Sequence, residues 1–244
     1  MITTEEQVDR TTMSMAEVAL NFPQALGVLQ KYNLDYCCGG KKPFNEVCKK
    51  AGVDSTSVWK EIIAVANNHG SDNRMNFNTW EVSLIIDFIL QHHHSYVRSA
   101  IPQIQELLEK VCSVHGNDTP DLFTIRKDFN DLAEELMDHM PKEENVLFPA
   151  MKRLFVTKSS TDDSDEERLR LRMPVKMMEH EHEEAGKLIK SIRDLTSNYT
   201  PPNYACPTFK MTYLMLQQFD TDLLQHIHIE NNILFPKVKE EVHS

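Results

Sequence analysis

Apolar residues recur at every third or fourth position through most of this chain, which is the spacing of one face of an α-helix. From about residue 79 onward, the pattern predicts four long amphipathic helices with modest connections, an arrangement typical of a four-helix bundle. They are expected at about 79–114, from about 119 to 143, at about 168–197 after an acidic linker at 157–167, and from a Pro-rich loop at 199–207 to about 230.

Shorter helices are expected before this bundle, at about 14–32, 43–50 and 54–68. Ser14 and Glu17 have the spacing of a capping box, which marks the start of a helix. A polar stretch at 69–78 separates the two patterns. The prediction is therefore a small helical domain at 1–70, which contains Cys37 and Cys38, followed by a four-helix bundle at 78–244.

Composition supports an all-α fold and narrows the partners. Among 244 residues, 41% are hydrophobic and only 7 are glycine, which suits packed helices. The formal net charge of −11 argues against nucleic acid as a partner, because phosphate binding needs a basic face. We expect no membrane partner, because no apolar run is long enough to span a bilayer and no secretory signal is visible. Five cysteines without a disulfide framework suggest a cytoplasmic location.

The strongest chemical signal is a motif that occurs twice, His-x-x-x-Glu-x-Asn-[Val/Ile]-Leu-Phe-Pro. One copy begins at His139 and includes Glu143, and the other begins at His226 and includes Glu230. Residues four apart lie on the same face of a helix, so each copy presents an imidazole beside a carboxylate. A carboxylate has two oxygens and can bridge two ions. The repeat therefore predicts a metal pair between facing helices.

Two more histidines fall on the apolar stripes of the other long helices, His94 on the first and His182 on the third. Burying two carboxylates and four imidazoles without a counter-charge would be very unfavourable, and bound cations would remove that cost. A donor set without thiolate suits iron or manganese, with zinc as an alternative, and two bridging glutamates favour two irons. The neighbours His92 and His93 are expected to be exposed.

Two other features are candidates for chemistry. Glu181 lies beside His182 in a glutamate-rich segment and could support a ligand or lie on a path for iron exit. The pair Cys37-Cys38 precedes two glycines, and a following helix N-terminus could lower a thiol pKa. A redox, metal-relay or NO-reactive role for this pair remains open beside a purely structural tight turn. The other three cysteines are expected to be structural.

Three motifs together resemble those of one known family, the "repair of iron centres" proteins. They are Asp35-Tyr-Cys-Cys-Gly-Gly40, the two Leu-Phe-Pro repeats and Pro201-Pro-x-x-x-Cys206. The resemblance implies a hemerythrin-like di-iron bundle with an extra N-terminal domain, involved in recovering iron–sulfur clusters damaged by nitric oxide or peroxide. It implies ligands at the six positions that the periodicity selects, namely His94, His139, Glu143, His182, His226 and Glu230. Val97 departs from a histidine often found there in the family.

The resemblance and the ligand pattern leave several functions to compare. The leading one is a protein with two carboxylate-bridged and oxo-bridged irons that supplies iron to apo or damaged iron–sulfur proteins. Alternatives are a di-iron NO reductase that forms N₂O, and an O₂ or NO sensor. Oxygen-carrying hemerythrins have a different ligand pattern, with a further histidine four residues after the one on the third helix. This chain has Gly186 at that position. A homodimer is left open.

Overall fold

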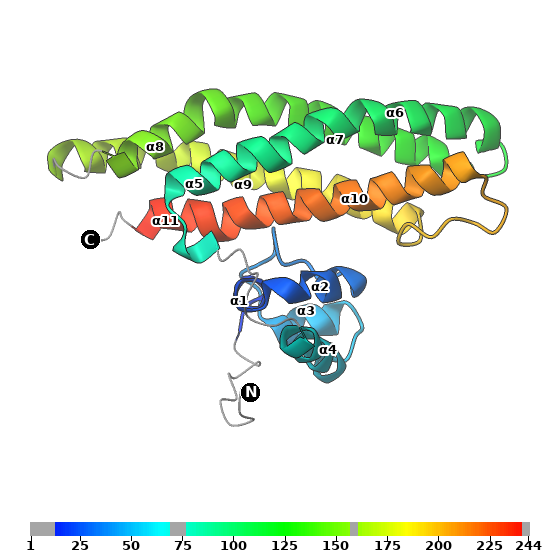
Figure 1. The fold of residues 1–244 in the computed structure, drawn as a ribbon, viewed down its shortest axis with the longest axis horizontal. Coiled ribbons are helices and arrows are strands. Elements are labelled where there is room, and N and C mark those ends of the chain that lie inside the picture. Colours follow the sequence, from blue (N-terminus) through cyan, green and yellow to red (C-terminus); the bar gives the residue numbers. More distant parts are fainter. Residues whose placement is uncertain (1–12, 69–76, 157–160, 241–244) are drawn as a thin grey trace. The chain divides into compact units, whose positions relative to one another are not determined.

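The chain folds into two compact units that consist of helices (Figure 1). The computed structural model describes residues 13–68, 77–156 and 161–240. The first unit comprises 1–80 together with 228–233, and the second comprises 81–227 with 234–244. The predicted domain boundary lies largely at residues 69–76, outside the described ranges, so independent folding of the two parts stays a prediction.

The described residues of the first unit contain four helices, where the apolar pattern predicted three, because the stretch expected at about 14–32 is divided in two. They are α1 (Met15–Asn21), α2 (Leu26–Lys31), α3 (Phe44–Lys50) and α4 (Ser55–Asn68), with a 3₁₀ turn at Pro23–Ala25. Ser14 and Glu17 form the predicted capping box. Pro23 separates α1 from α2 because its ring cannot follow the helical path. The side chain of Asp54 accepts backbone hydrogen bonds from Thr56 and Ser57 and thus caps the start of α4.

The second unit contains the long helices, and α6, α7, α9 and α10 run lengthwise beside one another (Figure 1). Its α-helices are α5 (Val82–Phe88), α6 (Ser95–His115), α7 (Asp121–Lys142), α8 (Phe148–Val156), α9 (Thr161–Leu195), α10 (Pro207–Ile229) and α11 (Phe235–Glu240). Buried apolar side chains fill the space between them, and the rings of Phe129 and Phe219 meet edge to face 5.3 Å apart. This confirms the predicted all-α bundle. In the described part of the chain, no helix has the length and apolarity needed to cross a membrane.

Helix α9 starts earlier than the sequence predicted. The acidic linker was expected at 157–167, but the helix already begins at Thr161, and 157–160 lie outside the described residues. The error has a physical reason: Asp and Glu near the start of a helix interact favourably with its dipole. An acidic run can therefore open a helix as readily as it can form a linker.

Among the described residues, three π turns interrupt the long helices, and each contains one of the candidate ligands, His94, Glu143 or Glu230. They are η3 (Ile89–His94), η4 (Glu143–Leu147) and η5 (Glu230–Leu234). In both copies of the repeated motif, the π turn begins at the glutamate and is followed by Phe-Pro. Each proline ring would clash with the carbonyl four residues earlier, that of Asn145 or Asn232. A wider turn moves that carbonyl away, so the motif itself explains the π turn.

A buried charged cluster joins α9 to α10. The guanidinium of Arg193 donates to both carboxylate oxygens of Asp220, at 2.8 and 2.5 Å. The hydroxyl of Tyr199 donates to the same carboxylate at 2.8 Å. Because both charged side chains are nearly buried, each depends on the other to offset its lost hydration.

Candidate metal centre

The six predicted ligands lie together inside the bundle. They are buried, at 0 to 3% exposure. Their ligand atoms form two groups, each within 4.8 Å. The first group is His94, Glu143, His226 and Glu230, and the second is His139, Glu143, His182 and Glu230. Both groups therefore contain the same two glutamates and a different pair of histidines.

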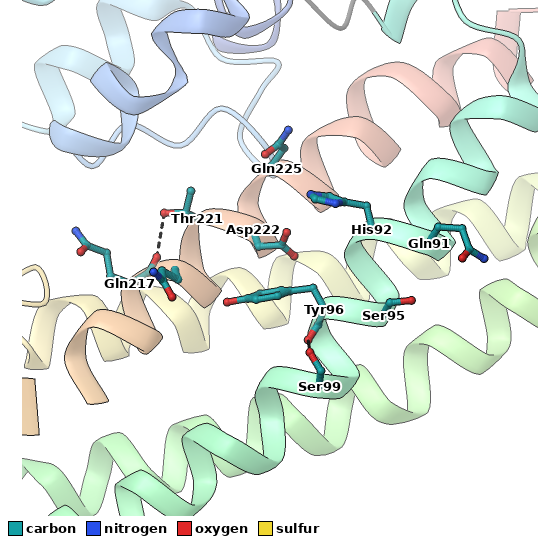
Figure 2. A pocket seen from close by; sticks show the side chains of 10 residues that line it. Gln91, His92, Ser95, Tyr96, Ser99, Gln217, Thr221, Asp222 and Gln225 are labelled. Atoms are coloured by element: carbon teal, nitrogen blue, oxygen red, sulfur yellow. Dashed lines mark hydrogen bonds between the residues drawn. The ribbon is translucent and has the colours of Figure 1, made fainter. Parts of the chain in front are cut away.

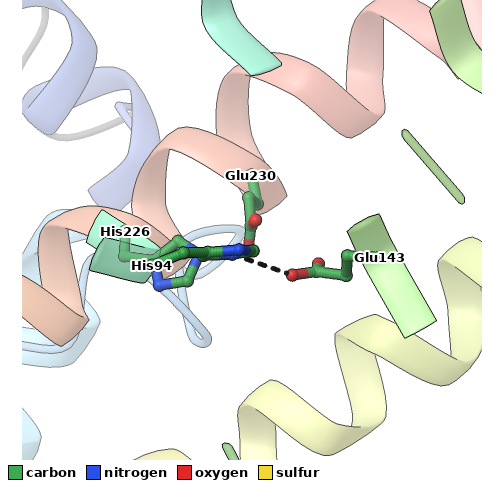
Figure 3. Close-up of side chains that lie close together, drawn as sticks. All are labelled: His94, Glu143, His226 and Glu230. Atoms are coloured by element: carbon green, nitrogen blue, oxygen red, sulfur yellow. Dashed lines mark ion pairs between the residues drawn. The ribbon is translucent and has the colours of Figure 1, made fainter. Parts of the chain in front are cut away.

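Glu143 belongs to both groups, and Figure 3 shows it within the first group, with its carboxylate facing His94. Its Oε2 is 3.3 Å from Nε2 of His94, and its Oε1 is 3.3 Å from Nε2 of His139. One oxygen of the carboxylate thus faces a histidine of each group. This is the arrangement that a bridging carboxylate requires.

The donor spacing fits metal ions. Nε2 of His182 is 3.2 Å from Nε2 of His139, and such a contact brings together two atoms that are both good metal ligands. Donors at about 2.1 Å from a shared ion lie about 3.0 to 3.4 Å apart, which agrees with these separations. Four imidazoles and two carboxylates without thiolate are a donor set that suits iron. Metal coordination by these residues stays a prediction, and their placement specifies which residues would share each ion.

The outer nitrogens of two of these histidines are held by carboxylates. Nδ1 of His139 lies 2.7 Å from Glu181, whose other oxygen accepts from Lys142 at 2.7 Å. This contact explains how Glu181, predicted as a supporting residue, can act on a ligand. A carboxylate at Nδ1 leaves Nε2 unprotonated and aimed at a metal, and it makes the imidazole a stronger donor.

The sequence analysis missed a matching contact at His94. Nδ1 of His94 lies 2.7 Å from Glu144, which also accepts two hydrogen bonds of 2.8 Å from Arg98. The one available signal was Arg98, placed four residues after His94 on the same helix face. Glu144 itself gave none, because it is 50 residues away in sequence and follows directly after a predicted ligand.

Both supporting carboxylates are kept ionised by their partners. Burial raises the pKa of Glu144, but hydrogen bonds from His94 and Arg98 outweigh it, and the pKa falls below its ordinary value. Burial likewise raises the pKa of Glu181, and hydrogen bonds from Lys142 and His139 lower it overall. Each acid therefore remains an acceptor for its histidine near neutral pH.

His93 is buried, so the prediction that it is exposed was wrong. Its exposed fraction is 0%, and its ring stacks on that of His226 with centroids 5.3 Å apart. The error comes from the π turn at Ile89–His94, which holds more residues per turn than an α-helix. It brings two consecutive histidines, His93 and His94, into the interior. His92 is exposed, as predicted.

The cysteine pair lies in a tight loop of the first unit. Asp35 accepts backbone hydrogen bonds from Cys37, Cys38 and Gly39, at 3.1, 3.0 and 2.8 Å. The two Sγ atoms are 3.6 Å apart, within reach of a weak hydrogen bond, and they are not joined by a disulfide. A Cβ on Gly39 would lie 2.6 Å from the Asp35 carboxylate. The loop therefore requires a glycine after the cysteines because the chain passes so close to that side chain.

The idea that a helix N-terminus lowers the thiol pKa was wrong for Cys37. Its hydrogen bond with Cys38, its burial and the nearby Asp35 charge all raise the pKa of Cys37 well above the usual value. The next helix, α3, begins only at Phe44. Cys37 is therefore protonated near neutral pH. Roles for Cys37 and Cys38 in chemistry stay a prediction.

A pocket of 310 Å³ reaches the second group of ligands. Its lining includes His139 and His182 together with acidic and basic side chains, Glu135, Asp138, Lys142, Glu181 and Glu184. Burial, and after it the charges of nearby acids such as Glu184 and Glu181, raise the pKa of Glu135. Such a pocket attracts cations.

Comparison with known proteins identifies the family. A family model described as "Hemerythrin HHE cation binding domain" matches residues 85–238. A second, "Domain of Unknown function (DUF542)", matches residues 11–66. The iron-sulfur cluster repair protein YtfE of Yersinia pseudotuberculosis serotype IB is 31% identical over 231 residues, which are 94% of this chain and 98% of that protein.

The chain belongs to the repair of iron centres family. Another relative is the probable iron-sulfur cluster repair protein of Haemophilus influenzae, 31% identical over 93% of this chain and 96% of that protein. The iron-sulfur cluster repair protein YtfE of Yersinia pestis strain Pestoides F is 31% identical, with coverage of 94% and 98%. Family membership confirms the hemerythrin-like bundle and its cation-binding character.

Proposed function

We propose that this chain holds two iron ions between its helices and supplies iron to damaged iron–sulfur proteins. Glu143 and Glu230, which belong to both ligand groups, would be shared by the two ions. His94 and His226 complete the site of one ion, and His139 and His182 that of the other. The observation that carries this assignment is the pair of ligand groups that share both glutamates.

The proposal that the bound iron serves cluster repair rests on the names of the relatives. Proteins that match this chain over nearly their whole length are named for iron–sulfur cluster repair. When bound, a carboxylate-bridged iron pair provides redox-active metal with open coordination positions. The chain's own residues keep the imidazoles oriented through Glu144 and Glu181. We place this activity in the cytoplasm, where the five cysteine thiols would stay reduced.

We further propose that iron leaves through the acidic pocket beside His139 and His182. Glu135, Asp138 and Glu184 line this pocket together with the two ligands. Carboxylate oxygens are suitable ligands for iron. An ion that moves from one carboxylate to the next leaves in several small steps, so its release does not need to cross one large barrier. A further acid of the lining, Glu181, is restrained by its salt bridge of 2.7 Å with Lys142. Iron of the second group is therefore expected to leave first.

Metal content tests the centre itself. Purified wild-type protein should contain two irons per chain. The double variant Glu143→Leu/Glu230→Leu should lose most of this iron, because the bridging ligands are removed from both sites. Glu106→Gln, which changes an exposed acid on α6, serves as the control. Near-full iron in the double variant, measured by elemental analysis, would contradict the centre.

Iron transfer tests the repair function. The protein is loaded with labelled iron, mixed with an apo iron–sulfur acceptor, cysteine and a sulfide source, and cluster absorbance is followed. Reduced protein should transfer faster than oxidised protein, because carboxylates prefer the ferric ion. Asp138→Asn and Glu135→Gln should slow transfer while the initial iron content stays unchanged, and Glu106→Gln should have no effect.

The same experiment separates the alternatives. If iron stays bound while NO is converted to N₂O, the protein is an NO reductase and not a donor. If iron stays bound in both redox states and O₂ binds reversibly, the oxygen-binding alternative replaces the repair function. Transfer that is equal in the pocket variants and the wild type would retain the donor role but contradict the exit path.

A further inference from the structure

A separate cluster of potential metal ligands lies in the second unit and is distinct from both ligand groups of the proposed iron centre. It consists of His92, His93 and Asp222, whose ligand atoms are within 4.8 Å of one another. The two histidines belong to the π turn at Ile89–His94, and the aspartate belongs to α10. None of the three belongs to the six-residue ligand set of the centre.

The buried part of this group has polar atoms without partners. Nδ1 of His93 is 3.0 Å from Oδ1 of Asp222, and their side chains are 0% and 14% exposed. Nε2 of His93 and Oδ2 of Asp222 are both buried, and neither makes a hydrogen bond among the described residues. A buried carboxylate oxygen without a partner is costly. A simple histidine–aspartate hydrogen bond therefore leaves half of this carboxylate unsatisfied.

A cation would satisfy the carboxylate better than the histidine alone. Two donors on one ion, with bonds of about 2.1 Å at right angles, lie about 3.0 Å apart, which matches the separation of Nδ1 and Oδ1. His92 supplies the third donor. Two imidazoles and one carboxylate with open positions form a donor set that binds Fe²⁺ and related divalent ions.

A pocket of 710 Å³ gives solvent and ions access to this group (Figure 2). His92 and Asp222 line it, and they point toward each other from facing helices. The other lining residues are Gln91, Ser95, Tyr96, Ser99, Gln217, Gln218, Thr221 and Gln225. This lining contains no lysine or arginine that would compete with a cation for the carboxylate. Instead, the Asp222 charge contributes to raising the pKa of Tyr96, after the larger effect of burial.

We propose that His92, His93 and Asp222 form a further binding site for a divalent transition-metal ion such as Fe²⁺, Co²⁺ or Zn²⁺. The ion binds between the His93–Asp222 pair and His92, and the pocket leaves its remaining positions to water. With three protein ligands and an open side, the site exchanges its ion more readily than a closed structural site.

This site lies next to the proposed iron centre. The His93 ring stacks on His226 with an interplanar angle of 2°, and His93 directly precedes His94. An ion held here is thus separated from the centre by one layer of imidazole. The proposal does not depend on the repair function, because it concerns metal binding alone and would stand if iron transfer failed.

The test is a Co²⁺ titration of the full iron-loaded chain by equilibrium dialysis, with iron content measured at every point. Wild type should bind one Co²⁺ per chain without losing iron and should show the visible ligand-field bands of nitrogen–oxygen coordination. His92→Gln and Asp222→Asn should each weaken Co²⁺ binding by about tenfold or more. His92 is exposed, so its variant tests the site without threatening the fold.

Two control variants make the result specific. Gln217→Ala changes the lining of the same pocket without removing a ligand, and His180→Gln removes a histidine from the other pocket. Both should bind Co²⁺ as the wild type does. The proposal is overturned if no Co²⁺ binds beyond the iron centre, or if binding is equal in wild type, His92→Gln and Asp222→Asn. Loss of affinity in His180→Gln alone would place the bound ion elsewhere and would also overturn it.

Discussion

Glu144 and Glu181 hold the outer nitrogens of two predicted metal ligands, His94 and His139, at the same distance of 2.7 Å. Each carboxylate is in turn paired with a basic side chain from the ligand's own helix, Arg98 or Lys142. The site thus extends one layer beyond its ligands. This layer sets which nitrogen of each imidazole faces inward.

Replacing Glu144 by Gln should lower metal affinity by about 10- to 100-fold, because the amide holds the imidazole less strongly and does not increase its basicity. Competition with a chelator of known affinity measures the change. Glu106→Gln on α6 is the control and should retain wild-type affinity. If Glu144→Gln also retains it, the contact to His94 has no role in the centre.

Burial also affects His228, a histidine that does not belong to the predicted ligand set. Burial lowers the pKa of His228 to about 4, and a backbone interaction with Tyr36 opposes this in part. The unfolded chain binds a proton at this residue below about pH 6.5, whereas the folded chain binds it only below about pH 4. The contribution of neutral His228 to the free energy of unfolding is therefore fully present above about pH 6.5 and is lost progressively as the pH falls to about 4.

Replacing His228 by Gln should remove about 3 kcal/mol of this pH dependence, as follows from the difference between the two pKa values. Urea unfolding of iron-free protein at about pH 7.5 and about pH 4.5 provides the measurement, so that metal loss does not contribute. The exposed His180→Gln variant should keep the full wild-type slope. A His228→Gln slope equal to that of the wild type would contradict the prediction.

Helices α9 and α10 are joined by an ion pair whose strength depends on burial. Arg193 and Asp220 are 12% and 6% exposed at their side chains, whereas Lys190 and Asp194 form an ion pair on the surface of α9. Removing one member of a buried pair leaves the other charge without hydration or partner. A surface pair has water as an alternative and contributes little.

Asp220→Ala should therefore destabilise the bundle by about 3 kcal/mol or more, and Asp194→Ala by less than about 1 kcal/mol. Chemical unfolding of both variants in the same metal state measures this contrast. Equal effects of the two substitutions would show that burial does not govern the strength of these pairs.

The elements were predictable from sequence where local patterns determine them. Ser14 and Pro23 mark helix ends through their own backbone chemistry, and the i to i+4 spacing of His139 and Glu143 places both on one face. His93 and Glu144 were missed because their roles depend on a π turn and on a contact 50 residues away. An ideal helical period contains neither kind of information.

At the scale of the whole molecule, the six predicted ligands all lie after residue 80, and the two family models match separate stretches, 11–66 and 85–238. This division predicts that the bundle carries the metal site without the N-terminal part. The Cys37-Cys38 loop would then serve a separate step, such as passing iron or responding to NO.

A fragment that begins at Met75 should fold as a helical bundle and bind iron as the full chain does. Circular dichroism and elemental analysis of the purified fragment provide the measurement. Full-length Cys37→Ser/Cys38→Ser protein is the matched comparison, because it should also keep its iron. A soluble fragment with an intact helical spectrum but without metal would contradict the two-domain interpretation.

The π turns at Glu143–Leu147 and Glu230–Leu234 also give the bundle a way to open without melting. A π turn is a local defect that can slide along a helix by one residue through the exchange of a few backbone hydrogen bonds. Each such step rotates the passed side chain by about 100° around the helix axis. Because Glu143 and Glu230, the two predicted bridging ligands, are each the first residue of their turn, one step of sliding would swing the carboxylate away from both ligand groups and leave the helices on either side folded.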